Sequence, residues 1–308
     1  MTSNVQGTEQ ECLLCLKLAD LQRSHIVPAF VFRWLKQNSI SGTLRSGQAP
    51  NRRIQDGPKR DWLCRKCESR LSKWETLFAS QLFYPILEDG RATHCYSSWM
   101  ALFCTSLCWR TLKLAQVEVE CNFLQADRPS LVKEALHCWE EFMLGRVKEP
   151  GKFELHFVPL DGIVSEVAAE LHPFINRYLS LGVDAEILED VENLIVYVKL
   201  PSMVILGMIQ PNSLKAWKDT QIRSKKGTIC PLVSPLPKVF FDFLNHRSNL
   251  LASMSEELSQ SQQNNITSVL ETDLSITARS AFAKALRQDI GLSGVSAALP
   301  HLNKLEDE

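Results

Sequence analysis

The sequence lacks a long hydrophobic run. Its longest apolar run, residues 99–109, is too short to span a bilayer and is followed at once by Arg110 and Lys113, so we expect no transmembrane helix and no membrane partner. The N-terminus also lacks a basic start followed by an apolar segment, so we expect no signal peptide. With 45% hydrophobic and 22% charged residues, the composition predicts a soluble globular protein of the cytoplasm.

The signature motifs of several enzyme classes are missing as well. The sequence contains no glycine-rich phosphate loop of Walker or Rossmann spacing and no nucleophilic serine elbow. This absence removes the main sequence support for an NTPase, a dinucleotide-dependent enzyme or an α/β-hydrolase. We also find no internal repeat, which argues against a solenoid or propeller.

Cysteine, in contrast, is plentiful. Four of the ten cysteines form two C-x-x-C pairs, Cys12 with Cys15 and Cys64 with Cys67. In a chain without a secretion signal, such pairs favour metal binding over disulfide formation. Two thiolates from each of two tight turns match tetrahedral Zn²⁺. We therefore expect a structural zinc ion that closes the loop of residues 16–63.

The net charge of −1 hides a strong asymmetry. Between residues 17 and 73 there are 13 Lys and Arg but only four Asp and Glu. The rest of the chain holds the other 21 basic and 31 acidic residues. Residues 39–59 are rich in arginine, glycine and proline and predict a basic loop or ribbon. A basic excess confined to the predicted zinc segment indicates a polyanionic partner, although a solvated basic surface has the same composition.

Hydrophobic periodicity predicts an α+β fold. We expect a disordered N-terminus at residues 1–10, a zinc-bound domain at 11–88 and a mostly helical α+β domain of unknown role at 89–308, with a polar linker or loop at 259–267. Helical spacing covers residues 28–37, 97–119, 129–146, 239–258 and 276–289, and a further helix follows the second cysteine pair until Pro85. Alternation predicts a strand near 153–157, and two β-branched runs predict an antiparallel hairpin at 194–200 and 203–209. Trp99, Trp109 and Trp139 are expected in the helical core, with Cys104 and Cys108 as buried thiols.

The order of these motifs resembles the HNH branch of the His-Me finger endonucleases. The resemblance covers roughly the first 85 residues, and the matching positions are Cys12, Cys15, His25, Ile26, Val27, Pro28, Leu63, Cys64 and Cys67. Within that branch the chain is most similar to a bacterial group of undefined role, which shares segments like residues 24–28, 50–53, 55–57, 63–68 and 83–85. The resemblance implies a small ββα-metal module of treble-clef type.

The resemblance also implies roles for individual residues. His25 would be the general base that deprotonates a water for attack on phosphorus, beside one Mg²⁺ or Mn²⁺ ion. Two ligand positions depart from the family pattern, because Ser24 replaces an acidic ligand and Glu68 replaces the last histidine. The family's asparagine also falls where this chain has Lys59, Arg60 and Asp61, with Asn51 further back. Glu68 suits a hard cation, and Glu75 lies on the same helical face. Asn51 is the candidate for the family's asparagine. Further candidate carboxylates are Asp56 and Asp61.

Non-catalytic roles stay open for the same side chains. His25 is equally explained as a hydrogen-bonded structural histidine or as a phosphate contact. Glu68 also suits the positive end of a helix, and Asn51 also suits a turn. We expect a nucleic-acid partner, DNA rather than RNA, contacted by Arg45, Arg52, Arg53, Lys59, Arg60, Arg65 and Lys66.

Two functions therefore remain. The first is a metal-dependent endonuclease, and the second is a catalytically inactive, zinc-stabilised nucleic-acid-binding module. In either case the C-terminal region is available for a protein partner or for self-association. A purely structural zinc scaffold is disfavoured by the basic charge of the zinc segment.

Overall fold

The computed structural model describes residues 9–39, 42–46, 49–89, 93–118, 125–160, 171–232, 236–264, 268 and 280–298. Helices and strands are mixed throughout these residues, and each pair of neighbouring strands among them is antiparallel. The predicted α+β class is confirmed at this level. Of the N-terminus predicted to be disordered, residues 1–8 lie outside the described part of the chain, and Gln10 begins a strand.

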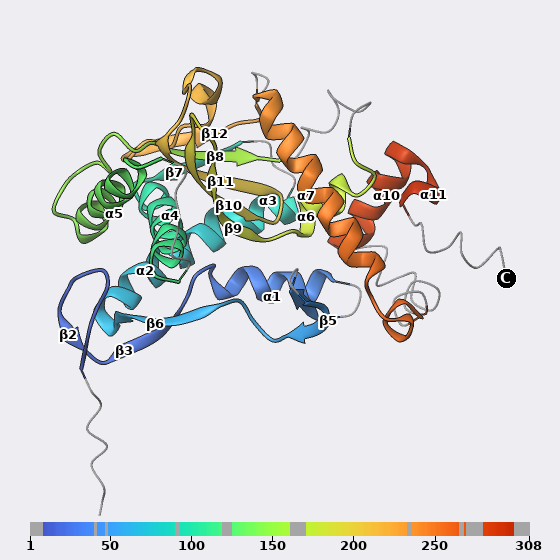
Figure 1. Ribbon diagram of the computed structural model, residues 1–308, viewed down its shortest axis with the longest axis horizontal. Helices are drawn as coiled ribbons and strands as arrows, with labels where there is room; N and C mark the ends of the chain where they lie inside the picture. The colour runs from blue at the N-terminus through green and yellow to red at the C-terminus, as the bar shows by residue number, and fades with distance from the viewer. Residues whose placement is uncertain are drawn as a thin grey trace, which may run out of the picture.

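The N-terminal segment consists of short β-hairpins and two helices (Figure 1). Its strands are β1 (Gln10–Glu11), β2 (Leu18–Ala19), β3 (Leu21–His25), β4 (Leu44–Ser46), β5 (Ala49–Ile54) and β6 (Lys59–Cys64), and its helices are α1 (Ala29–Asn38) and α2 (Arg65–Phe78). Strand β3 pairs with β6, which runs directly into α2. The β4–β5 pair turns the basic stretch into a ribbon. Helix α1 begins just after Pro28, whose fixed backbone angle suits a helix start.

The helix after the second cysteine pair does not stop at Pro85, so that prediction was wrong. Helix α2 passes into a π-helical turn, η1 (Ala79–Phe83), and then into α3 (Tyr84–Asp89). Proline has no N–H to bond the carbonyl four residues back, which normally breaks a helix. Here the N–H of Tyr84 already bonds the carbonyl of Ala79, five residues back. The wider π turn thus lets the helix continue through the proline.

The rest of the chain is built on a four-stranded sheet in the order β8-β11-β10-β9. Its strands are β8 (Leu155–Pro159), β9 (Asp184–Glu189), β10 (Leu194–Leu200) and β11 (Met203–Gln210), and a separate pair is formed by β7 (His94–Ser97) and β12 (Lys226–Ile229). The helices are α4 (Trp99–Glu118), α5 (Arg128–Leu144), α6 (Ile175–Leu181), η4 (Lys215–Thr220), α7 (Lys238–Glu256), α10 (Ala281–Ser293) and α11 (Val295–Ala298). The predicted β10–β11 hairpin is confirmed.

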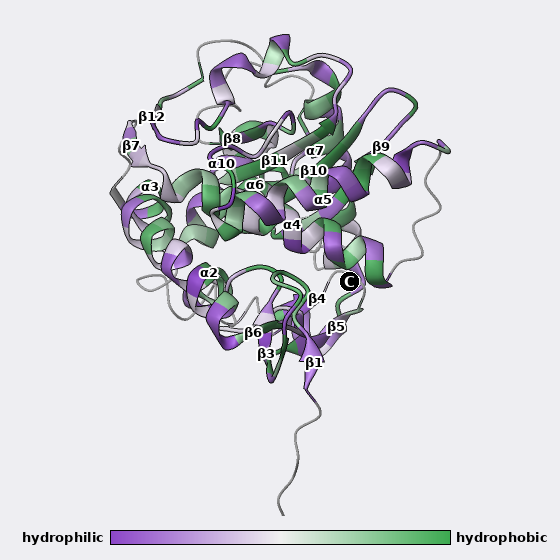
Figure 2. Ribbon diagram, turned by 90° about the vertical axis from the view of Figure 1, so that its left-hand side faces the viewer, coloured by the Kyte–Doolittle hydropathy of each residue, from purple (hydrophilic) through white to green (hydrophobic). Residues whose placement is uncertain are grey.

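Both faces of this sheet are covered, which explains its unbroken apolar strands. Val196 and Val198 join a core cluster with α4, whereas Tyr197 between them joins a second cluster with α6 and α7. Figure 2 shows β10 and β11 as largely hydrophobic, in contrast to β5 in the N-terminal segment. Trp99, Trp109 and Trp139 are buried as expected, and so are Cys104 and Cys108.

The zinc segment and the sheet region share one continuous core. The first cluster runs from Cys12 to Ile229, and Phe78 of α2 stacks on Phe103 of α4 with ring centroids 3.8 Å apart. The domain boundary near residue 88 stays a prediction. Within the predicted polar linker, residues 260–264 are helical, and 265–267 lie outside the described part. None of the described helices has the length and apolar character needed to cross a membrane.

Candidate zinc centre and adjoining histidine site

The four cysteines of the C-x-x-C pairs converge beside the β3–β6 hairpin. Their Sγ atoms all lie within 4.8 Å of one another, and the Sγ atoms of Cys15 and Cys64 are 3.8 Å apart. A tetrahedral ion with metal–sulfur bonds of about 2.3 Å holds its sulfurs about 3.8 Å apart, so this donor set fits Zn²⁺. Within the described residues, it is the one group of three or more ligating side chains close enough to share an ion.

Local backbone geometry shapes each cysteine pair. At the first pair, the N–H of Leu16 donates to the carbonyl of Cys12 at 2.8 Å, and Leu16 takes a positive φ of 60° to close the turn. At the second pair, Cys64 ends β6 and Cys67 lies in the first turn of α2. The N–H of Cys64 donates to the Sγ of Cys12 at 3.3 Å, which joins the two pairs.

The surroundings of the thiols agree with a bound cation. Burial raises the pKa of Cys64, but hydrogen bonds from Cys67 and the neighbouring thiols outweigh it and lower this pKa to about 7. Burial, together with the charge of Cys12, raises the pKa of Cys67. Four crowded thiols cannot all ionise without compensation, and a divalent cation supplies it. The predicted zinc ligands therefore fit the metal in both position and chemistry.

His25 lies at the far end of β3 and is held by Asp56. Its Nε2 atom is 2.8 Å from Oδ2 of Asp56, and Nζ of Lys59 is 3.0 Å from the same oxygen. Burial raises the pKa of Asp56, but hydrogen bonds from His25, Lys59 and the N–H of Gly57 outweigh it and lower this pKa to about 2. In a neutral imidazole, the ionised carboxylate favours the proton on Nε2, so that Nδ1 is the acceptor.

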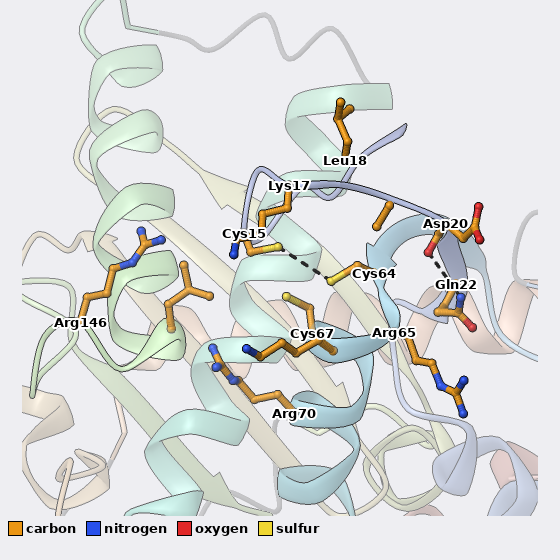
Figure 3. A pocket seen from close by; sticks show the side chains of 13 residues that line it. Cys15, Lys17, Leu18, Asp20, Gln22, Cys64, Arg65, Cys67, Arg70 and Arg146 are labelled. Atoms are coloured by element: carbon orange, nitrogen blue, oxygen red, sulfur yellow. Dashed lines mark hydrogen bonds between the residues drawn. The ribbon is translucent and has the colours of Figure 1, made fainter. Parts of the chain in front are cut away.

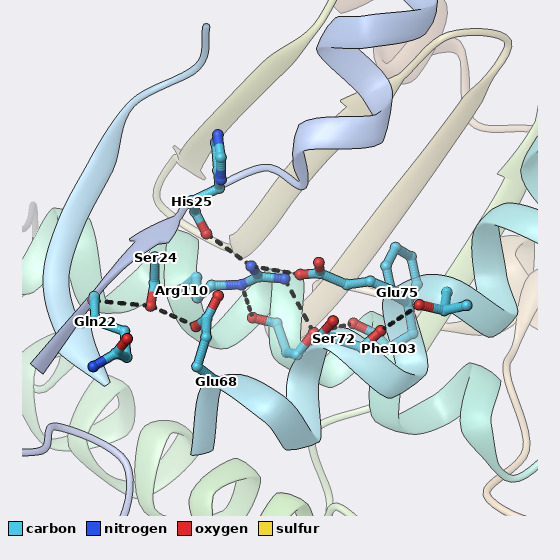
Figure 4. Close-up of polar contacts among 10 residues, drawn as sticks. Gln22, Ser24, His25, Glu68, Ser72, Glu75, Phe103 and Arg110 are labelled. Carbon is cyan, nitrogen blue, oxygen red and sulfur yellow. Dashed lines mark hydrogen bonds and ion pairs between the residues drawn. The ribbon is translucent and has the colours of Figure 1, made fainter. Parts of the chain in front are cut away.

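The two positions that depart from the family pattern face each other. Ser24 is buried in β3, and its Oγ–H donates to Oε2 of Glu68 at 2.5 Å (Figure 4). Glu68 stands in the first turn of α2, so this bond joins the end of the hairpin to the start of the helix. The structure thus brings Ser24 and Glu68 together as a hydrogen-bonded pair.

Glu75 pairs with a residue that the sequence reasoning missed. Nη1 of Arg110, on α4, is 2.9 Å from Oε1 of Glu75 and donates to the main-chain carbonyl of His25 at 2.7 Å. The Nε and Nη2 atoms of Arg110 donate to the carbonyl and the hydroxyl of Ser106, at 3.2 and 3.3 Å. The arginine is only 2% exposed. A charged side chain within the apolar stretch that became α4 was the available signal, because arginine is rarely buried without a partner.

Nothing in this arrangement supports the expected Mg²⁺ or Mn²⁺ ion. One oxygen of Glu68 accepts the hydroxyl of Ser24, and the charge of Glu75 is compensated by the buried guanidinium of Arg110. The described residues form no second group of three ligating side chains. The cationic group that lies between β3 and α2 is the guanidinium of Arg110. This residue belongs to α4, outside the first 85 residues that resemble the HNH branch.

Asn51 has a different environment from the one expected of a catalytic residue. Its Nδ2 donates to the carbonyl of Glu257 at 2.8 Å, and its Oδ1 accepts the N–H of Ser259 at 2.9 Å. Nearby, Nη1 of Arg45 donates to Oε1 of Gln262 at 2.6 Å. Asn51 lies in strand β5, not in a turn, and its amide ties the basic ribbon to the chain that follows α7.

The predicted nucleic-acid contacts do not form one surface. Arg52 and Arg53 are exposed on β5, whereas Lys59 pairs with Asp56. Arg60 forms a two-pronged ion pair with Glu118 at the end of α4, which raises the pKa of this arginine. Arg65 and Lys66 are exposed at the start of α2, on the side of the cysteine cluster.

A groove of about 670 Å³ beside the cysteine cluster gathers cations from several elements (Figure 3). Its basic lining consists of Lys17, Arg65, Lys66, Arg70 and Arg146, and the acid among the lining residues is Asp20. Gly145, with a φ of 76°, ends α5 and turns the chain so that Arg146 reaches the groove. The sequence reasoning did not group Lys17, Arg70 and Arg146, because three separate elements supply them.

Comparison with known proteins adds no assignment. No family model, no curated protein and no solved structure matched the chain. The similarity to the HNH branch therefore stays a prediction that depends on the motif residues themselves.

Proposed function

We propose that this protein is a zinc-stabilised nucleic-acid-binding protein. The observation that carries the proposal is the groove beside the cysteine cluster, where five cationic side chains line one hollow with a single acid. Lysine and arginine at fixed positions bind the phosphates of a nucleic acid without regard to sequence.

The metal gives this groove its rigidity. One wall is the chain that follows Cys15, and the other is the start of α2 that follows Cys64. A zinc ion bound by both cysteine pairs would fix the two walls relative to each other, so that little conformational entropy is lost on binding. A turn with two cysteines, an antiparallel strand pair and a helix around one zinc ion also agree with the treble-clef module that the resemblance implies.

A second candidate function, cleavage of a phosphodiester, is favoured by the pairing of His25 with Asp56. The carboxylate orients the imidazole, and Nδ1 of His25 could take the proton of a water that attacks phosphorus. The P–O bond to the leaving sugar oxygen then breaks, and that oxygen takes a proton from solvent. Lys59 would then stabilise charge on the phosphate. In this version of the HNH-type reaction no step passes through a divalent ion, since Glu68 and Glu75 are both engaged.

One experiment tests the proposal and separates it from cleavage. Zinc-loaded full-length protein is titrated into labelled DNA and RNA at 50 to 200 mM salt, and the same samples are analysed for cleavage. His25→Ala is compared with the control His137→Ala, which changes an exposed histidine on α5. We expect binding that weakens steeply with salt in all three proteins, without cleavage.

Two other outcomes have clear meanings. Cleavage that His25→Ala abolishes and His137→Ala retains would establish the second candidate. If the folded, zinc-loaded protein binds neither DNA nor RNA at 50 mM salt, the proposed function is refuted.

A further inference from the structure

The basic groove continues along α2 beyond the cysteine cluster. A second hollow of about 390 Å³ is lined by Lys66, Ser69, Arg70, Lys73 and Trp74. It shares Lys66 and Arg70 with the first groove, so the two hollows adjoin. We name the combined surface the α2 strip, and its members are Lys17, Arg65, Lys66, Ser69, Arg70, Lys73, Trp74 and Arg146.

The α2 strip is separate from the histidine site. Its helical members at positions 66, 69, 70 and 73 recur at the spacing of one helix face. At 100° per residue, this row lies roughly opposite the row of Glu68, Ser72 and Glu75. The helix thus directs Glu75 towards Arg110 and Glu68 towards Ser24 of β3 (Figure 4), whereas Lys66 and Lys73 are exposed to solvent.

The strip follows α2 from Arg65 to Trp74, an aromatic residue. Lys66 and Lys73 are both exposed and lie seven residues apart, which is about 10 Å along the helix. Arg146 approaches the strip from the opposite side, where it also pairs with Glu141 at 2.6 Å (Figure 3). Trp74 is partly exposed and contributes to the floor of the second hollow.

We infer that the α2 strip binds single-stranded nucleic acid. Proteins that bind single strands combine a basic track for the backbone with an aromatic side chain on which a base stacks. In a duplex the bases are already paired and stacked, so Trp74 would find no base face to contact. In the inferred complex, phosphates lie on Lys66, Arg70 and Lys73, and a base packs against Trp74. This inference rests on the proposed function and names its ligand and its surface.

The test compares a 12-nucleotide oligo-dT, a 12-nucleotide oligo-U and a 12-base-pair duplex by fluorescence anisotropy. The variant Lys66→Gln/Lys73→Gln removes two exposed charges from the strip, and Arg52→Gln/Arg53→Gln removes two from the β4–β5 ribbon as a matched control. Each phosphate contact on a single strand contributes about 0.7 to the salt slope, or about five-fold in affinity at 0.1 M salt. We expect the strip variant to bind about 25-fold more weakly and its salt slope to fall by about 1.4. The control should show a much smaller loss of affinity.

Trp74 supplies an independent readout. Trp74→Leu removes the ring, and Trp74→Phe keeps an aromatic face while changing the packing in a similar way. We expect Trp74→Leu to weaken binding of the single strands at least five-fold and Trp74→Phe to retain most of the affinity. The duplex should bind more weakly than either strand, with no difference between the two variants.

Each result bears on a different statement. If the wild type binds no nucleic acid, the proposed function itself fails. If it binds but prefers the duplex, or if the ribbon variant loses as much affinity as the strip variant, the α2 strip is refuted and the proposed function stands. Thermal unfolding of every variant identifies losses that come from misfolding.

Discussion

The ion pair of Glu75 with Arg110 gives the sharpest test of the histidine site, through the substitution Glu75→Gln. Glutamine has the same shape and keeps an amide oxygen for Nη1 of Arg110, but it removes the negative charge. The guanidinium side chain is 3% exposed and the carboxylate side chain 21%. The substitution would therefore leave a buried cation with only neutral acceptors, those of His25, Ser106 and the new amide.

The expected loss follows from this burial. Removing one partner of a fully buried pair costs about 3–5 kcal/mol, and the partial exposure of Glu75 reduces this to about 2–3 kcal/mol. For a chain of 308 residues, an unfolding entropy of about 2.1 cal/mol/K per residue converts the loss into a fall in Tm of about 3–5 °C. The double variant Glu75→Gln/Arg110→Met should lose less than the sum of the single variants, because no unpaired charge remains.

Thermal unfolding followed by circular dichroism, with and without 5 mM Mn²⁺, measures these losses. Glu149→Gln, at an exposed position, is the control and should leave Tm unchanged. Our account of the site would be contradicted by two results together. Mn²⁺ would raise the Tm of the wild type, and the Glu75→Gln variant would have a normal Tm that Mn²⁺ no longer raises. Glu75 would then be a metal ligand, and Arg110 would not be the cation of this site.

Two further predictions concern the zinc centre and Asp56. Cys67→Ser should lose the zinc ion and unfold the hairpin and groove, whereas Cys95→Ser, at an exposed position, should keep one zinc per chain in a metal assay. Asp56→Asn should lower the free energy of unfolding at pH 7 by about 1–2 kcal/mol, after allowance for the exposed third of the side chain. Because the folded-state pKa of Asp56 is about 2 against the ordinary 3.8, its contribution is fully present above pH 4 and is lost as pH falls towards 2. The difference in free energy of unfolding between wild type and variant, measured by denaturant unfolding, should become smaller as pH falls from 4 to 2.

Patterns carried by neighbouring residues made most of the fold and the cluster of four cysteines predictable. Each C-x-x-C pair supplies two ligands from one turn, so the spacing alone indicated the metal. Helix α4 and the β10–β11 hairpin followed from their apolar periods. At Pro85 the local rule failed, because the chain enters the proline through a π turn in which the N–H of Tyr84 bonds the carbonyl of Ala79.

Partners that are distant in sequence could not be predicted in the same way. Arg110 lies 85 positions after His25 and binds its main-chain carbonyl, a group that every residue has. Asn51 binds the main chain of Glu257 and Ser259, again without a side-chain signal. The groove takes Lys17, Arg70 and Arg146 from elements that only the folded chain brings together. Sequence thus indicated the kinds of chemistry, and packing decided which residues share a site.

Two attachments hold the β3–β6 strand pair, and they act at its opposite ends. At one end, the N–H of Cys64 in β6 bonds the Sγ of Cys12, and both residues belong to the cluster of four cysteines. At the other end, Arg110 of α4 binds the carbonyl of His25, while α4 packs between α2 and the large sheet. Helix α2 is common to both attachments, with its cations on one face and its acids on the other. Charge that is buried against Arg110 therefore fixes the helix whose opposite face presents Lys66, Arg70 and Lys73. Helix α4 thus links the sheet region physically to α2, which carries the proposed nucleic-acid surface.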